Sequence, residues 1–157
     1  MNKPEYIVIH HSFTPDGPAK NWDAICRYHV ETNGWRKVGY HYGIELVGAT
    51  MMVFNGRQED EEGAHCKEMG MNSKSIGICI IGDFDVVPPS IEHMKTAAAV
   101  CQIIAVHYDI PRENLIGHRD AGLMAGYDWK QGQFKTCPGK MFPLGTLRTM
   151  VWTPEAL

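Results

Sequence analysis

The sequence predicts a single α/β domain, residues 1–157, with a mixed central β-sheet flanked by helices. Apolar runs of strand length alternate along the chain with helical patterns, which is typical of a sheet covered by helices. No linker, internal repeat or low-complexity stretch divides the chain. With 44% hydrophobic and 21% charged residues, a chain of this length can bury a core of its own.

Five segments have the pattern of strands. The first, residues 6–10, is rich in β-branched residues, and residues 75–81 are apolar throughout, as expected for a central strand covered on both faces. Gly48-Ala49-Thr50 separates two further runs and predicts a hairpin. The predicted strands are residues 6–10, 42–47, 51–54, 75–81 and 115–116.

Three segments predict helices. Asn21 is a good N-cap for a helix that ends before Gly34, and Ser90 caps the strongest helical pattern of the chain, residues 91–108. A last helix covers residues 144–151. The connecting segments are interpreted as a turn at residues 12–18, a cleft-bordering loop at 55–72 and a glycine-rich loop at 122–133.

Charge and hydropathy exclude several classes of partner. The formal net charge is −3 and no basic run is present, so nucleic acid is not an expected partner. No apolar stretch approaches the roughly 20 residues that a membrane-spanning helix needs, and the first residues contain no apolar signal core. We expect a monomer made in the cytoplasm without a signal peptide and without a membrane partner.

The chain contains five cysteines and eight histidines. An odd number of cysteines without a CxxC pair argues against a disulfide framework and against a structural zinc knuckle. Cys79 and Cys101 lie in apolar patterns and are interpreted as small buried residues, while Cys26 and Cys66 are left as unassigned thiols.

Three of these residues could form a catalytic zinc site. His10 and His118 end two predicted strands, and Cys137 precedes Pro138-Gly139. Two imidazoles and one thiolate, with a fourth position open to water, are the donor set of such a site. Strand alternation sends neighbouring histidines to opposite faces, so only one of His10 and His11 can take part.

Six segments resemble, in this order, the zinc-dependent N-acetylmuramoyl-L-alanine amidases of type 2, which include small bacteriophage lysozyme-like amidases and the peptidoglycan recognition proteins. One such segment is weak evidence, whereas six in order are specific. They are Ile9-His10-His11-Ser12, Val38-Gly39-Tyr40-His41-Tyr42, Gly63-Ala64-His65, Ser75-Ile76-Gly77-Ile78, Gly117-His118-Arg119-Asp120 and Lys135-Thr136-Cys137-Pro138-Gly139.

The resemblance implies a role for each matching residue. His10, His118 and Cys137 match the ligands of one zinc ion per chain, and Tyr40 and Lys135 match the catalytic tyrosine and lysine. In that role Lys135 offers a positive charge to the developing oxyanion, and Tyr40 can relay a proton. A tyrosine in an extended segment is more often a packing residue, and a lysine near a loop is usually solvated.

Substrate contacts are implied at four further positions. His65 matches a cleft-facing position, although a structural role is as plausible, and Trp35 would either stack on a sugar or cover the core. Asp83 and Phe84 follow the central strand where the family binds the stem peptide.

One departure concerns the connection between His118 and Cys137, which is longer than the family's compact one. The excess, residues 121–134, would be either a substrate-gripping loop or a surface excursion. It also leaves Asp120 or Asp128 as a fallback third ligand.

The resemblance implies hydrolysis of the amide between N-acetylmuramic acid and L-alanine in peptidoglycan. The role would be that of a phage or prophage endolysin, held in the host cytoplasm until it reaches the wall, or that of a cytosolic amidase recycling muropeptides. A non-catalytic peptidoglycan-binding module is the second class considered. Such relatives typically lose the cysteine ligand, so Cys137 argues for catalysis. A third, regulatory reading, binding to a host polymerase, has no specific support in the sequence.

Overall fold

The computed structural model describes residues 3–14 and 20–153 and contains one mixed sheet. The strand order is β3-β2-β4-β1-β5, so β4 is the middle strand, and β1, although it comes first in the chain, lies inside the sheet between β4 and β5. β1 is parallel to β4 and β5, β2 is parallel to β4, and β3 pairs antiparallel with β2 at the edge. The strands are β1 (Tyr6–His11), β2 (Tyr42–Val47), β3 (Thr50–Asn55), β4 (Ser75–Ile80) and β5 (Leu115–Gly117).

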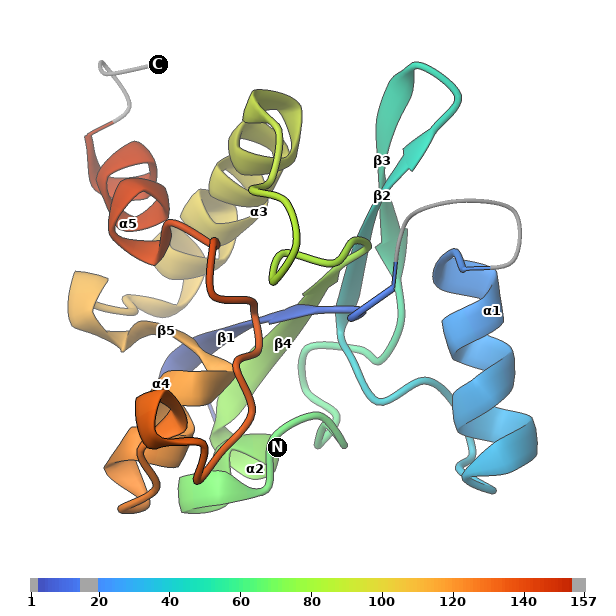
Figure 1. The fold of residues 1–157 in the computed structure, drawn as a ribbon, viewed down its shortest axis with the longest axis horizontal. Helices are drawn as coiled ribbons and strands as arrows, with labels where there is room; N and C mark the ends of the chain where they lie inside the picture. The colour runs from blue at the N-terminus through green and yellow to red at the C-terminus, as the bar shows by residue number, and fades with distance from the viewer. Residues whose placement is uncertain (1–2, 15–19, 154–157) are drawn as a thin grey trace.

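Helices cover both faces of this sheet (Figure 1). α3 and α5 pack against each other on one face, while α2 and α4 lie on the other face and α1 lies beside the β2 end. Among the described residues, no helix combines the length and the apolar character needed to cross a membrane. The helices are α1 (Trp22–Arg27), which continues as a π-helix (Tyr28–Thr32), α2 (Met71–Lys74), α3 (Ile91–Tyr108), α4 (His118–Met124) and α5 (Leu144–Trp152), with 3₁₀ turns at Glu68–Gly70, Arg112–Asn114 and Trp129–Gln131.

The alternation of side chains along β1 divides the interior into two sides. Ile7 and Ile9 belong to the large apolar cluster under α3 and α5. Val8 packs on the opposite side, in the cluster that holds Ile116 and Ala121. His10 follows Val8 by two residues and therefore projects from that second face, whereas His11 projects toward Phe84.

The mixed α/β fold predicted from the sequence is confirmed, and all five predicted strands and the three predicted helices are present. Cys79 and Cys101 are fully buried, as expected. The turn predicted at residues 12–18 falls largely on residues 15–19, which lie outside the described residues.

Two connections predicted as loops contain helix. The segment 55–72 ends in a 3₁₀ turn and in the start of α2. The predicted glycine-rich loop at 122–133 begins within α4. Gly122 packs against the ring of Phe134, and a side chain on residue 122 would collide with that ring. Glycine is therefore present here for close packing, and its frequency in this segment is misleading as a loop signal.

Glu61 ties the loop after β3 to the segment before β2. Its carboxylate accepts hydrogen bonds from Lys37 Nζ at 2.6 Å, from Arg36 at 2.9 Å and from the backbone N–H of Gln58 at 2.7 Å. Its backbone oxygen lies 3.0 Å from Nε2 of the buried His41. These bonds, that to Lys37 first, lower the pKa of Glu61 to about 2.

We predict that Glu61→Gln lowers the unfolding free energy near neutral pH, with a cost that disappears in acid. Because the pKa of Glu61 is lower in the folded chain than its ordinary value of 4.5, its stabilisation is present above that value and is lost as the pH falls toward about 2. Urea denaturation of both proteins across this range measures the gap. A gap that stays constant with pH would contradict the prediction, and the exposed Glu62→Gln is the control.

Candidate metal centre and active site

Strand register brings His10 and His118 together. Ile9 pairs with Gly117 across β1 and β5, so the residues that follow them, His10 and His118, are neighbours. Their ring centroids are 4.7 Å apart, and both side chains are buried. Two parallel strands thus place two imidazoles on one side of the sheet without any contribution from a flexible loop.

Cys137 reaches the same place from a loop that α4 holds. The backbone N–H of Arg119 donates to the carbonyl of Cys137 at 2.7 Å, and the guanidinium of Arg119 donates to the carbonyls of Gly139 and Phe142. The Cys137 Sγ lies 3.6 Å from His10 Nδ1. One donor atom from each of His10, His118 and Cys137 lies within 4.8 Å of the other two.

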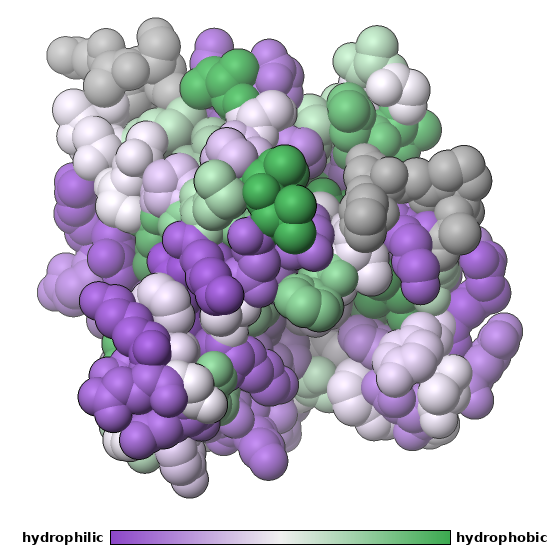
Figure 2. All heavy atoms as spheres, in the orientation of Figure 1, coloured by the Kyte–Doolittle hydropathy of each residue, from purple (hydrophilic) through white to green (hydrophobic). Residues whose placement is uncertain are grey.

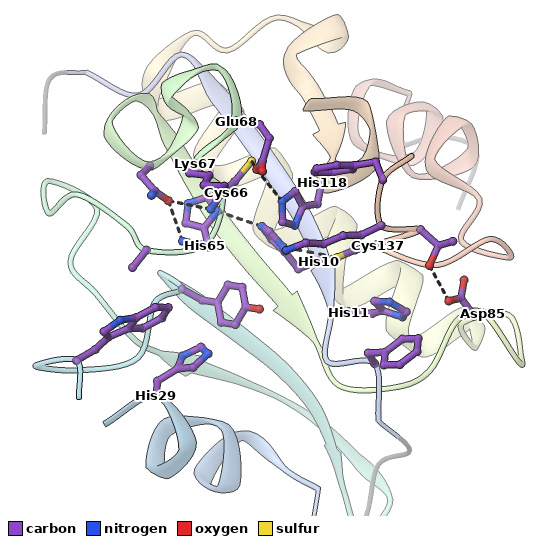
Figure 3. A pocket seen from close by; sticks show the side chains of 18 residues that line it. His10, His11, His29, His65, Cys66, Lys67, Glu68, Asp85, His118 and Cys137 are labelled. Atoms are coloured by element: carbon purple, nitrogen blue, oxygen red, sulfur yellow. Dashed lines mark hydrogen bonds and ion pairs between the residues drawn. The ribbon is translucent and has the colours of Figure 1, made fainter. Parts of the chain in front are cut away.

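His10 and His118 each contact a further side chain next to the cluster (Figure 3). His10 Nε2 is 3.0 Å from His65 Nδ1, and His118 Nε2 donates to Glu68 Oε2 at 3.0 Å. Each imidazole thus uses one nitrogen for a neighbouring side chain, and the other nitrogen stays available to the cluster.

The protonation states suit metal binding. Burial, followed by the nearby His118, His65 and Lys135, holds the pKa of His10 well below its ordinary value, and burial also lowers that of His118. Both rings are therefore neutral at pH 7, as imidazole ligands must be. Burial raises the pKa of the Cys137 thiol to about 12, while the His11 backbone N–H and the charges of Lys135 and Arg119 oppose it.

These residues fit a zinc ion. Two neutral imidazoles and one cysteine form a donor set that zinc accepts in catalytic sites, where a fourth position is left for water or substrate. A metal at this point deprotonates a coordinating thiol, so the raised pKa of Cys137 describes the protein before loading. Of the two fallback ligands, Asp120 accepts from the Gly117 N–H and Asp128 from the Lys130 N–H, and neither belongs to the cluster.

Tyr40 lies beside the cluster, with its ring centroid 5.1 Å from that of His10. Burial, followed by the neighbouring Cys79 and Cys137 thiols, raises the pKa of Tyr40 well above its ordinary value. The hydroxyl therefore keeps its proton at neutral pH and can donate a hydrogen bond.

Lys135 is exposed and lines the same cavity. Its positive charge contributes to lowering the pKa values of His10, His118 and Cys137. The preceding Phe134 packs against His118, at 5.5 Å between ring centroids, and against Gly122. The end of the 121–134 segment is therefore anchored on the site.

The cluster opens into a cavity of about 810 Å³. Its walls come from opposite sides of the molecule: His29 and Trp35 follow α1, while Phe134 and Lys135 follow α4. The face seen in Figure 2 is mostly hydrophilic and is hollowed between these two sides.

Four substrate contacts were predicted, and two of them line the cavity. Trp35 lies in its wall, packed on His29 at 4.8 Å between ring centroids, and His65 lies in its floor. Phe84 and Asp83 are not among the lining residues. The prediction for Phe84 is corrected because the ring is 2% exposed and packs in the core against Phe142, and the neighbouring Asp85 borders the cavity instead.

Sequence reasoning missed several residues of the cavity wall. His29 accepts a hydrogen bond from the Gly39 N–H and also faces the cavity. Glu68 lies in a stretch without a periodic pattern, and only its place three residues after His65 could have suggested it. Further lining residues that were not expected there are Phe13, Cys66, Lys67 and Asn72.

Comparison with known proteins shows the family of this chain. The family model described as N-acetylmuramoyl-L-alanine amidase matches residues 1–140, which include all three residues of the cluster. The chain belongs to this family. The human N-acetylmuramoyl-L-alanine amidase is 30% identical over 123 residues, covering 73% of this chain and 20% of the human protein. The endolysin of Klebsiella phage KP32 is 38% identical over 79 residues, covering 50% of this chain and 48% of the endolysin.

Solved structures of this amidase fold are similar over nearly the whole chain. The N-acetylmuramoyl-L-alanine amidase LysC from Clostridium intestinale has a TM-score of 0.75 at 25% identity, covering 95% of this chain and 85% of LysC. A mutant of Drosophila peptidoglycan-recognition protein LB in complex with tracheal cytotoxin has a TM-score of 0.70 at 25% identity, covering 98% and 84%. The chain spans only between a fifth and a half of the length of the first curated relatives that it matches.

Gly77 of β4 makes room for His65 in this amidase fold. A Cβ on residue 77 would lie 2.5 Å from two carbons of the His65 ring, which Gly63 confines from the other side. We predict that Gly77→Ala costs about 1–3 kcal/mol of unfolding free energy through overpacking and displaces His65 from His10. Thermal and urea unfolding measure the cost.

Gly145→Ala is the matched control, since a Cβ at this position of α5 meets nothing within 4 Å. It should leave stability unchanged or raise it by about 0.5–1 kcal/mol, because alanine favours helix over glycine. Equal stabilities for Gly77→Ala and the wild type would show that the His65 ring is not confined.

Proposed function

We propose that this chain is a zinc-dependent N-acetylmuramoyl-L-alanine amidase that cleaves the amide between N-acetylmuramic acid and the L-alanine of the stem peptide. The observation that carries the proposal is the convergence of His10, His118 and Cys137 within 4.8 Å on the floor of the large cavity. The family match and the relatives named as amidases support the bond that is attacked.

Each residue of the site has a separate role in the proposed reaction. His10, His118 and Cys137 hold the zinc ion, which when bound polarises the amide carbonyl and activates water. Lys135 supplies a positive charge beside the carbonyl, where negative charge develops as the amide is attacked. Tyr40 holds a proton at its hydroxyl and donates a hydrogen bond toward the reacting group.

The cavity also suits the substrate class. A muramyl peptide combines a sugar ring with a short peptide, and the walls offer the exposed edge of Trp35 on one side and Phe134 on the other. The Drosophila relative in complex with tracheal cytotoxin and the relatives named peptidoglycan-recognition proteins support peptidoglycan as the partner.

A role as a phage or prophage endolysin is part of the proposal, supported by similarity to the endolysins of phages KP32 and T3. In that role the protein accumulates in the host cytoplasm and acts on the wall after release. A muropeptide-recycling amidase shares the same chemistry, so mass spectrometry of products from intact sacculi and from soluble muropeptides separates the two roles.

Removal of the metal is expected to abolish hydrolysis. Treatment of the purified chain with a chelator should stop the release of dye-labelled peptidoglycan, and added Zn²⁺ should restore it, because the two histidines and the cysteine then regain their ion. Metal analysis should find one zinc per chain. Release that persists in full after verified metal removal would refute the zinc mechanism.

Cys137→Ser is the companion variant. It removes the thiolate and should bind sacculi as the wild type does while no longer cutting them. Should the wild type itself bind sacculi but release nothing with zinc present, the chain would be a recognition module.

Lys135→Ala is expected to lower kcat by ~10²–10³, the usual cost of removing one group that stabilises an oxyanion. KM should change little if the charge acts on the reacting carbonyl and not on the rest of the substrate. Steady-state kinetics on a soluble muropeptide separate the two constants. Lys95→Ala, at an exposed position of α3, is the control, and a kcat equal to that of the wild type in Lys135→Ala would contradict the role.

A further inference from the structure

One short segment, residues 63–72, supplies both side chains that hold the histidines of the cluster. Asn72 closes this segment: its Oδ1 accepts from the backbone N–H groups of His65 and Cys66, each at 2.8 Å, and its carbonyl accepts from the Gly63 N–H at 2.8 Å. His65 then contacts His10, and Glu68 contacts His118.

The contact between Glu68 and His118 is buried. The two side chains are 8% and 6% exposed, and Glu68 Oε2 lies 3.0 Å from His118 Nε2. The Cys66 thiol donates to the same carboxylate oxygen at 3.5 Å. A carboxylate that is taken out of water needs such donors, and these two satisfy it.

The backbone that follows Glu68 adopts an uncommon conformation. Met69 and Gly70 both adopt left-handed conformations, with φ of 53° and 69°. Methionine rarely takes this conformation, so its presence here indicates that the surrounding contacts enforce it.

We infer that Glu68 is a positioning residue for the metal centre: by accepting the Nε2–H of His118 it fixes the ring and its tautomer, so that Nδ1 is the nitrogen presented to the ion. This inference rests on the proposed zinc site. His10 follows the same pattern, since its Nε2 contacts His65 while its Nδ1 faces Cys137 at 3.6 Å. A carboxylate behind a ligating imidazole also raises its basicity and strengthens metal binding.

Cys66, Glu68 and His118 also lie within 4.8 Å of one another and could be taken for a second metal site. The hydrogen bonds argue against it, because the thiol and the imidazole both already donate to the one carboxylate. Burial, and next the neighbouring Glu68, raise the pKa of the Cys66 thiol to about 12, so this thiol remains a donor. The three groups form a hydrogen-bond chain that ends on His118.

The test measures metal binding apart from hydrolysis. Zn²⁺ affinity of the full chain is determined by competition with a chromophoric chelator for the wild type, Glu68→Ala and Glu68→Gln, together with zinc stoichiometry and the absorption spectrum of the Co²⁺ form. Glu113→Gln, at an exposed position before β5, is the matched control, and far-UV circular dichroism verifies folding.

We expect Glu68→Ala to raise the zinc Kd by roughly 10–100-fold with one ion still bound and an unchanged cobalt spectrum. Glu68→Gln keeps an acceptor oxygen and should lie between it and the wild type. An unchanged Kd in Glu68→Ala would overturn the inference, as would a second zinc lost with Glu68 or a cobalt spectrum that reports a lost ligand. Failure of the wild type to bind zinc at all would instead refute the proposed function.

Discussion

The pairing of β1 between β4 and β5 is the constraint on which the site depends. It sets His10 beside His118 through the register of Ile9 and Gly117, and it sets His10 opposite Cys79 of β4. Tyr40 lies beside the His10 ring, with 5.1 Å between the ring centroids. Three elements distant in sequence thus converge because backbone hydrogen bonds of the sheet hold them, and Cys137 is the one member of the cluster that a loop must deliver.

Local patterns were sufficient for most elements and insufficient for their arrangement. The β-branched run at 6–10 and the Ser90 cap of α3 are encoded within a few residues, so the strand and the helix could be predicted. The place of β1 inside the sheet, between β4 and β5, depends on contacts between distant segments, which no local period contains. Gly122 was misjudged for the same reason, since its neighbour Phe134 is distant in sequence.

The candidate site shows the same division. His10, His118 and Cys137 could be named before the structure because their residue types and surrounding motifs are distinctive, and the structure brings the three together. Phe84 and Glu68 could not be placed correctly. Phe84 follows a strand end near the site, yet its ring turns into the core against Phe142. Glu68 lies in a segment without a periodic pattern, and its contact with His118 joins residues that are distant in sequence.

The connection between His118 and Cys137 is held at two points, Phe134 on Gly122 and Trp129 under the guanidinium of Arg119 at 4.7 Å. Between these anchors, residues 130–133 are exposed, and a side chain on Gly132 would meet nothing within 4 Å. We therefore expect that a fluorescent label or an affinity tag introduced at this exposed tip leaves the rim of the cavity intact.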